Sequence, residues 1–348
     1  MAGPTIIPVF IPQQGCPGQC IYCLKEVVGG GAAAPPLAPE ALVADACRFF
    51  RAQGVERADE LAFYGGTFTM LPVQTQERLL EAAVRQREAG YIRAIRLSTR
   101  PDALDPERCA RLAFYQVKLV ELGVQSLDAR VLAASGRGYT PQQVAAGQQL
   151  LQAAGIEAAF QLMLGLPKQT WRSVLETGRE VRRLRPAGVR IYPLLVFRGT
   201  ALEAAWRSGA YQPLALPTAV AQASYWRHSF QAAKIPVFRI GLQLAPAEAA
   251  QAVAGPWHPA FASLVAAHGA RAVLGRQLDR LGGAGGRTRV SLAPGKLAAS
   301  LRQDKAKWIQ LLKDYPDTDF EFANNDAGAD CLIKICNLTE KNEHFSRC

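Results

Sequence analysis

The sequence predicts an α/β fold, a partial (β/α)6 TIM-like barrel that is open on one side, with a small C-terminal α+β extension. Short apolar runs alternate with longer segments of helical period from residue 5 to about residue 240. This alternation is typical of βα units repeated around a parallel sheet. We count six units, and a closed barrel needs eight. An ordinary doubly wound sheet is the alternative that the same pattern allows.

The six predicted strands are apolar runs of five to seven residues: Ile6–Ile11, Glu60–Tyr64, Ala94–Ser98, Leu119–Gly123, Ala158–Leu164 and Val189–Pro193. Helical periodicity is found between them, at Pro39–Gln53, Val73–Glu88, Pro141–Ala154 and Trp171–Leu184. In a fold of this class the functional residues gather where the strands end, at the carboxyl edge of the sheet.

We expect three parts along the chain: a core domain over residues 1–240, a helical connector with a Gly-rich linker over 241–286, and a small α+β unit over 287–348. In the last part, the expected strands are Val290–Leu292, Phe320–Phe322 and Cys331–Ile335, and the expected helix is Gly295–Lys313. The Gly/Ala/Pro-rich stretch Val27–Pro39 cannot sustain a helix, so we expect a loop there.

Composition indicates a soluble globular protein with 49% hydrophobic and 20% charged residues. No apolar run of about 18 residues occurs, and the first residues lack the pattern of a signal peptide, so we expect a cytoplasmic protein that does not enter a membrane. The net charge of +11 allows an anionic partner such as RNA. A solvated helix face explains the arginine-rich stretch over residues 172–190 equally well.

Three of the eight cysteines lie close together in the segment Gly15-Cys16-Pro17-Gly18-Gln19-Cys20-Ile21-Tyr22-Cys23. On a helix these thiols would share one apolar face, but the glycines and the proline favour a looped backbone. Three cysteines within eight residues then indicate metal ligation directly after the first strand. The five remaining cysteines are scattered and are expected to be ordinary free thiols.

Three thiolates are one ligand short of a structural zinc site or a fully protein-ligated [4Fe-4S] cluster, and no histidine is near. A cubane with three protein ligands keeps one iron open to another molecule. Zinc binding and inert thiols are the alternatives.

Several motifs resemble the radical S-adenosylmethionine (SAM) superfamily, whose signature spacing the three cysteines match. The resemblance is closest to the Elongator catalytic-subunit branch, through Phe63-Tyr64-Gly65-Gly66-Thr67-Phe68, Ser98-Thr99-Arg100-Pro101-Asp102, Glu121-Leu122-Gly123-Val124-Gln125-Ser126 and the block from Ile191 to Thr200. Gly123-Val124-Gln125, Arg137 and Gly165-Leu166-Pro167-Lys168-Gln169-Thr170 are also similar to oxygen-independent coproporphyrinogen oxidases. The matches cover about residues 6 to 240.

This resemblance implies a [4Fe-4S] cluster held by Cys16, Cys20 and Cys23, and reductive cleavage of SAM to a 5′-deoxyadenosyl radical. It assigns the SAM-binding residues by motif: Tyr22 beside the adenine, Gly65 and Gly66 with Thr67 and Ser98 near the methionine amino group, Gln125 and Gln161 on the ribose, and Arg137 on the carboxylate. An arginine fork suits a carboxylate, and an amide suits a pair of hydroxyls. A surface arginine and a strand-end cap are the alternatives for Arg137 and Gln125.

Two departures limit what the resemblance implies. The chain keeps a compact cysteine spacing and shows no Gly-rich loop for coenzyme A, so we expect no acetyl transfer. It also lacks a counterpart of the substrate domain of the coproporphyrinogen oxidases, so a porphyrinogen is not expected.

We therefore expect a radical SAM enzyme that takes electrons from a flavodoxin- or ferredoxin-type donor and acts on RNA, with tRNA as the leading substrate. The alternatives are a small metabolite as substrate and a non-catalytic iron–sulfur or RNA-binding protein.

Overall fold

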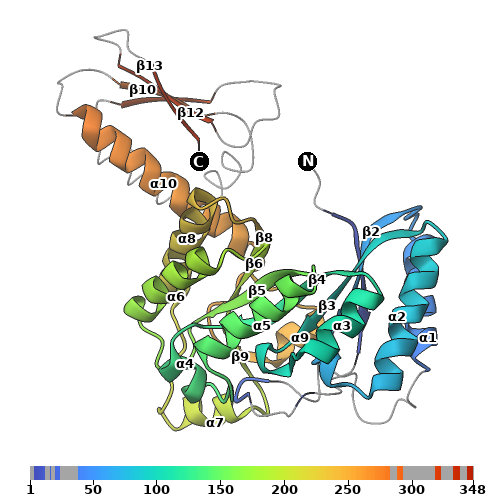
Figure 1. The fold of residues 1–348 in the computed structure, drawn as a ribbon. Helices are drawn as coiled ribbons and strands as arrows, with labels where there is room; N and C mark the ends of the chain where they lie inside the picture. Colours follow the sequence, from blue (N-terminus) through green and yellow to red (C-terminus); the bar gives the residue numbers. More distant parts are fainter. Residues whose placement is uncertain are drawn as a thin grey trace. The chain divides into compact units, whose positions relative to one another are not determined.

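The structure is a computed structural model that describes residues 4–11, 16, 20–23, 38–282, 288–292, 318–322, 332–337 and 343–347, and the side chains up to residue 272 (Figure 1). The chain forms two compact units. The first comprises Met1–Ala215 and Ser229–Trp257, and the second comprises Leu216–His228 and His258–Cys348.

The first unit is built on a seven-stranded sheet in which every neighbouring pair is parallel. Its strand order is β1-β2-β3-β4-β5-β6-β8. The strands are β1 (Ile6–Phe10), β2 (Ala58–Tyr64), β3 (Ile92–Thr99), β4 (Val117–Gln125), β5 (Glu157–Leu164), β6 (Gly188–Pro193) and β8 (Val237–Ile240). Because consecutive strands are neighbours and parallel, each connection crosses over outside the sheet.

Helices form most of these connections (Figure 1). They are α1 (Pro39–Ala52), α2 (Val73–Glu88), α3 (Pro106–Phe114), α4 (Ala129–Ala134), α5 (Pro141–Ala153), α6 (Trp171–Leu184), α7 (Ala201–Arg207) and α8 (Leu216–Ala232), with short 3-10 helices at Phe68–Met70 and Pro101–Ala103. Two further helices, α9 (Pro246–Gln251) and α10 (Phe261–Gly282), follow β8. Several of these helices have a side chain that caps the backbone N–H groups of their first turn. Thr140 and Gln143 form a capping box at α5, and Thr170 and Ser173 do so at α6.

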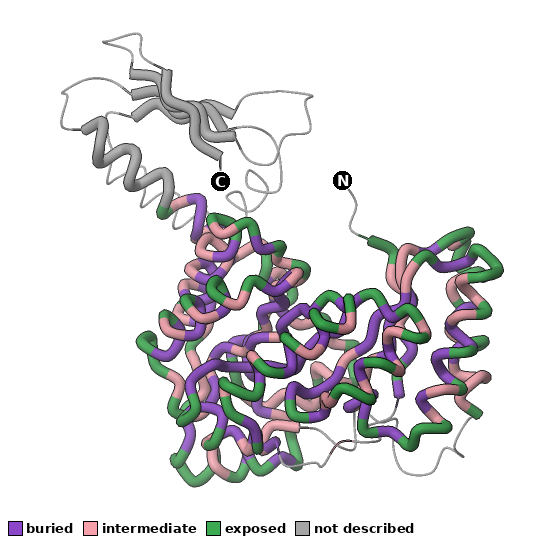
Figure 2. Tube along the Cα trace, viewed as in Figure 1, coloured by how far each residue is buried: buried purple, intermediate pink, exposed green. Residues whose placement is uncertain are grey.

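Successive side chains of a strand point to opposite faces, and here one face is apolar and the other carries charged residues. The apolar side chains, such as Leu61, Ile95, Leu122 and Phe160, are fully buried. Figure 2 shows the strands as the buried centre of this unit. The hydrophobic core therefore lies between the sheet and the helices, and the other face is available for a polar site.

Smaller sheets complete the described structure. In the first unit β7 (Val196–Phe197) pairs antiparallel with β9 (Ala252–Ala254). In the second unit four strands lie in the order β11-β10-β12-β13. These strands are β10 (Thr288–Leu292), β11 (Thr318–Phe322), β12 (Leu332–Asn337) and β13 (Glu343–Arg347). The helix expected at 295–313, the linker residues 283–286 and the loop residues 27–37 lie outside the described residues.

The structure confirms the predicted fold class, a partial parallel barrel, and contains all six predicted strands. A seventh strand, β8, was missed. It has only four residues, and Arg239 interrupts its apolar run. A pattern this short does not distinguish a strand from other structures. None of the described helices is long and apolar enough to cross a membrane.

Candidate functional site

A cavity of about 540 Å³ lies where the strands of the first unit end. It brings together all the residues that the sequence singled out: Cys16, Cys20, Tyr22, Cys23, Gly65, Gly66, Thr67, Ser98, Gln125, Arg137 and Gln161. They come from six different places along the chain. Parallel strands present their carboxyl ends at one edge of a sheet, which explains why such distant residues meet.

The three cysteines follow β1 and differ in exposure. Cys20 is buried, whereas Cys16 and Cys23 are half-buried. The backbone turns between the last two, because the Cys23 N–H donates to the Cys20 carbonyl over 3.2 Å. Sγ of Cys20 accepts a hydrogen bond from Nη1 of Arg137 at 3.0 Å. This bond places the positive charge of the guanidinium directly beside a sulfur that the sequence analysis assigned to the cluster.

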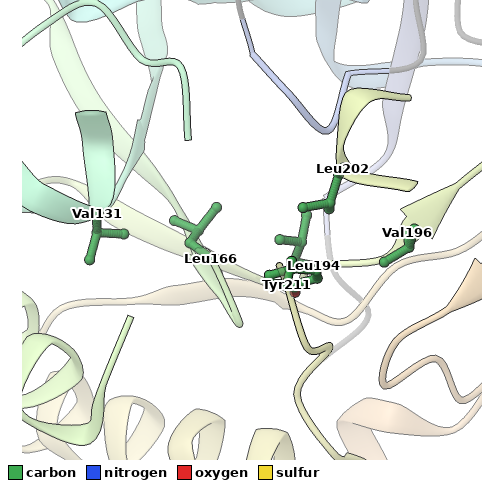
Figure 3. Packing of buried hydrophobic residues seen from close by; sticks show 6 residues of the cluster. All are labelled: Val131, Leu166, Leu194, Val196, Leu202 and Tyr211. Atoms are coloured by element: carbon green, nitrogen blue, oxygen red, sulfur yellow. The ribbon is translucent and has the colours of Figure 1, made fainter. Parts of the chain in front are cut away.

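A cluster of buried hydrophobic side chains, shown in Figure 3, supports the cysteine segment. The residues between the second and third cysteines, Ile21 and Tyr22, pack against it. Backbone hydrogen bonds add to this, from the Leu202 N–H to the Ile21 carbonyl at 2.8 Å and from the Ile21 N–H to the Ser135 carbonyl at 3.3 Å. The buried members of the cluster are Val131, Leu166, Leu194, Val196, Leu202 and Tyr211.

Arg137 is buried and uses each of its nitrogens. Besides the bond to Cys20, Nε donates to the Tyr139 hydroxyl at 2.8 Å and Nη2 donates to the Gly123 carbonyl at 2.6 Å. The Tyr139 hydroxyl also donates to Gly123. Burial raises the pKa of Tyr139 to about 12, although the Arg137 charge opposes this, so the phenol is neutral. Each terminal nitrogen of Arg137 carries two N–H groups, so one on each is available for a ligand.

Gln125 ends β4 in an uncommon backbone conformation, with a φ of 62°. A left-handed residue other than glycine costs free energy, and such strain is found at functional sites. The register of β4 with β5 also shifts just before it. Gly123, two residues earlier, leaves room, because a Cβ there would lie 3.0 Å from Nη2 of Arg137 and 3.1 Å from Nε2 of Gln125.

Gly65 follows β2 with a φ of 97°. A Cβ at this position would lie 2.7 Å from the Ile11 carbonyl oxygen, closer than real Cβ atoms come. The Ile11 N–H in turn donates to the Tyr64 carbonyl at 2.7 Å. Gly65 therefore permits the end of β1, from which the cysteine segment departs, to lie directly against the end of β2.

Four buried polar atoms on the cavity wall have no hydrogen-bond partner in the described structure. They are Tyr22 Oη, Ser98 Oγ, Gln125 Oε1 and Arg100 Nη1. Burial is also the main reason why the pKa of Tyr22 is raised, against the lowering effect of Arg137, so this phenol is neutral. Unpaired buried polar groups cost free energy, so a concentration of them indicates that a polar ligand completes the site.

Gln161 lies in the middle of β5 rather than at its end. Its Nε2 donates to Oε2 of Glu121 at 2.9 Å. It lines both the cavity that contains the cysteines and a second cavity, which is called the lower cavity below. Its amide nitrogen is therefore already engaged by a protein carboxylate.

Sequence reasoning assigned no role to several other residues of the cavity wall. These are Phe10, Tyr64, Thr99, Arg100, Gly123 and Tyr192. All but Phe10 occur in the motifs that carried the family resemblance, and each lies on a strand or directly after one. Their position at strand ends was the signal that could have found them.

The donor set fits a three-ligand cluster. Of the described residues that line the cavity, none is a histidine or a fourth cysteine. Within the described part of the chain, no three His, Cys, Asp or Glu side chains are arranged around a single metal ion. Three thiolates leave one iron of a cubane open, whereas a structural zinc site needs a fourth protein ligand.

Comparison with known proteins identifies the class. The family model of the radical SAM superfamily matches residues 10–181, and that of the radical SAM C-terminal domain matches residues 186–270. The chain belongs to the radical SAM superfamily, and it is a radical SAM enzyme of a class whose members bind a [4Fe-4S] cluster and SAM.

Its relatives lie in the Elongator branch, as the motifs indicated. A tRNA uridine(34) acetyltransferase of Dehalococcoides mccartyi is 28% identical over 246 residues, which are 61% of this chain and 53% of the relative. An uncharacterized protein of Methanocaldococcus jannaschii is 27% identical over 210 residues, 59% of this chain and 61% of the relative. The chain thus spans little more than half the length of these relatives.

The fold has a solved counterpart in the archaeal Elongator protein of Methanocaldococcus infernus with an N-terminal deletion. The TM-score is 0.60 at 21% sequence identity, over 81% of this chain and 64% of that chain. At this identity the likeness concerns the fold alone.

Proposed function

We propose that this chain holds a [4Fe-4S] cluster through Cys16, Cys20 and Cys23, binds SAM in the adjoining cavity and cleaves it reductively, with tRNA as the substrate. The observation that carries the proposal is the shared cavity, in which three thiols and four unpartnered buried polar atoms meet. The cluster, when bound, supplies the electron that breaks the S–C5′ bond of SAM.

The residues of the chain orient SAM in this proposal. Ser98 Oγ accepts from the amino group, Gln125 Oε1 accepts from the ribose hydroxyls, and Tyr22 faces the adenine. Arg137 has one N–H left on each terminal nitrogen for the carboxylate. Arg100 provides a further donor, because Asp102 binds its Nε and Nη2 at 2.9 and 2.7 Å and leaves Nη1 buried without a partner.

Two observations support tRNA as the substrate. The formal charge of the chain is +11, and a basic chain attracts the phosphate backbone. A related protein of Dehalococcoides mccartyi is named as a tRNA uridine(34) acetyltransferase. The lysines and arginine expected to add RNA contacts near the C-terminus, Lys296, Arg302, Lys305, Lys307 and Lys313, lie outside the described residues.

The test is anaerobic reconstitution with iron and sulfide, followed by reduction, addition of SAM and chromatographic detection of 5′-deoxyadenosine. Iron and 5′-deoxyadenosine should both be lost in Cys20→Ala. The matched control is Cys109→Ala, a buried thiol of α3 whose pKa burial raises to about 11, which should keep both. A wild-type chain with a full cluster and no product, with or without tRNA, would refute SAM cleavage.

The substrate is tested separately by adding tRNA to the reconstituted enzyme. Transfer RNA should bind, more weakly at higher salt, and should change the rate of 5′-deoxyadenosine formation. If SAM is cleaved but tRNA neither binds nor alters the rate, the tRNA part of the proposal fails and SAM cleavage stands.

A further inference from the structure

The inner face of the sheet carries charged residues where barrels usually carry branched apolar ones. Glu121 of β4 lies at its centre and is fully buried. Its carboxylate pairs with Arg96 of β3 at 3.1 Å and with Arg190 of β6 at 2.8 Å. Arg96 also pairs with Glu60 of β2 at 2.7 Å. These contacts balance two arginines with two glutamates inside the half-barrel.

A third arginine enters this interior from β8. Across the pairing of β6 with β8, Val189 is opposite Val237 while Arg190 is opposite Arg239. Phe238 is therefore an extra residue, which is the geometry of a β-bulge. A bulge re-aims the side chains beside it and is common next to active sites.

Both residues at the bulge reach the inner face. The Phe238 ring covers Gly188, where a Cβ would collide with it, and lies 5.4 Å from the Arg96 guanidinium carbon. Arg239 lines a cavity together with Glu121 and Arg190. Its Nη2 donates to the Gln243 side chain at 2.5 Å. No carboxylate of the described residues lies within ion-pair distance of Arg239, so this cavity carries one uncompensated positive charge.

The cavity has a volume of about 340 Å³, within the range of small-molecule sites. Strands from both edges of the sheet, β1 and β8, line it. It shares Phe10, Tyr64, Gln161 and Tyr192 with the cavity of the cysteines. The Tyr192 hydroxyl accepts from Nη1 of Arg190 at 3.4 Å and keeps its own proton to donate.

We propose that this lower cavity binds the carboxylate or phosphate group of a small organic anion, with Arg239 as its charge partner. Guanidinium and phenol donors suit an oxyanion, which would neutralise the remaining positive charge. Because the two cavities share wall residues, the rest of such a molecule would extend toward the cavity that contains the cysteines. That second step rests on the proposed function, because the reacting end of the molecule would then lie beside SAM.

The experiment measures thermal stabilisation and calorimetric binding of inorganic phosphate and of acetate, each against chloride at equal ionic strength. The cluster-loaded full chain with SAM is used. At least one of the two anions should bind, and the better of them identifies the group. Arg239→Gln should weaken its binding about tenfold, because a charged hydrogen bond is lost. The control Arg172→Gln, on an exposed arginine of α6, should bind as the wild type does.

Several outcomes would overturn the proposal. The first is that neither anion binds more strongly than chloride. The second is that Arg172→Gln loses as much anion affinity as Arg239→Gln. An affinity of Arg239→Gln for the anion equal to that of the wild type would also overturn the proposal. Cys16/Cys20/Cys23→Ala separates this proposal from the proposed function, since it should lose the cluster and still bind the anion. SAM affinity should be unchanged in Arg239→Gln.

Discussion

Arg137 and Cys20, 117 residues apart in the chain, are joined by a hydrogen bond of 3.0 Å from Nη1 to Sγ. The arginine follows α4, and the cysteine belongs to the segment after β1. The same guanidinium binds the carbonyl of Gly123 at the end of β4. Arg137 therefore connects a proposed cluster ligand to the strand end that carries Gln125.

Replacing Arg137 by glutamine tests this connection. We expect SAM to bind about tenfold more weakly, because a charged partner of its carboxylate is lost. Iron content should stay the same, since three thiolates remain. The reduction potential of the cluster should fall, because the positive charge that stabilises the reduced form is removed. Equilibrium dialysis and a redox titration followed by electron paramagnetic resonance measure the two effects. Arg93→Gln, on an exposed arginine of β3, is the control.

The left-handed backbone of Gln125 predicts that binding and stability respond differently to Gln125→Gly. The change removes the amide that faces the cavity and also relieves the φ of 62°, so SAM affinity should drop while the thermal midpoint does not. Lys168→Gly, at an exposed residue with a φ of 60°, should raise stability by roughly 0.5 kcal/mol and leave SAM binding intact. A lowered midpoint in Gln125→Gly would mean that the conformation is not strained.

Gly65→Ala should destabilise the chain by about 2 to 4 kcal/mol, because the new methyl meets the Ile11 carbonyl and the backbone is left-handed. The displaced end of β1 should also reduce iron loading. Gly155→Ala has a similar φ of 72° with nothing within 4 Å of the new methyl, so it should cost only about 1 kcal/mol. Equal losses in thermal unfolding for the two variants would contradict the close-contact explanation.

Glu121→Ala should lower the free energy of unfolding by about 3 to 5 kcal/mol, because it leaves Arg96 and Arg190 buried with too little negative charge beside them. Glu176→Ala is the matched control, because it breaks an exposed pair with Arg172 and should cost less than about 1 kcal/mol. Thermal unfolding of the two variants compares the costs. Similar values would show that the interior charges are well solvated.

The sequence predicted the fold class because it depends on local patterns, and the resemblance of its motifs supplied most of the residues that line the cavity. Cys16, Gly65 and Gln125 follow apolar runs, and parallel strands bring such positions together without knowledge of their exact pairing. The bond from Arg137 to Cys20 could not be predicted, since it depends on where a long connection returns. The bulge at Phe238 was also beyond prediction, because strand register is absent from a single sequence.

The segregation of the sheet into an apolar outer face and a polar inner face has an evolutionary consequence. Burial of residues such as Leu61 and Phe160 against the helices supplies the stability, and these residues do not contact the inner cavities. Selection on the packing and selection on the ligand therefore act on alternate residues of the same strands. A residue of the inner face such as Arg239 can therefore change without rebuilding the framework that supports it.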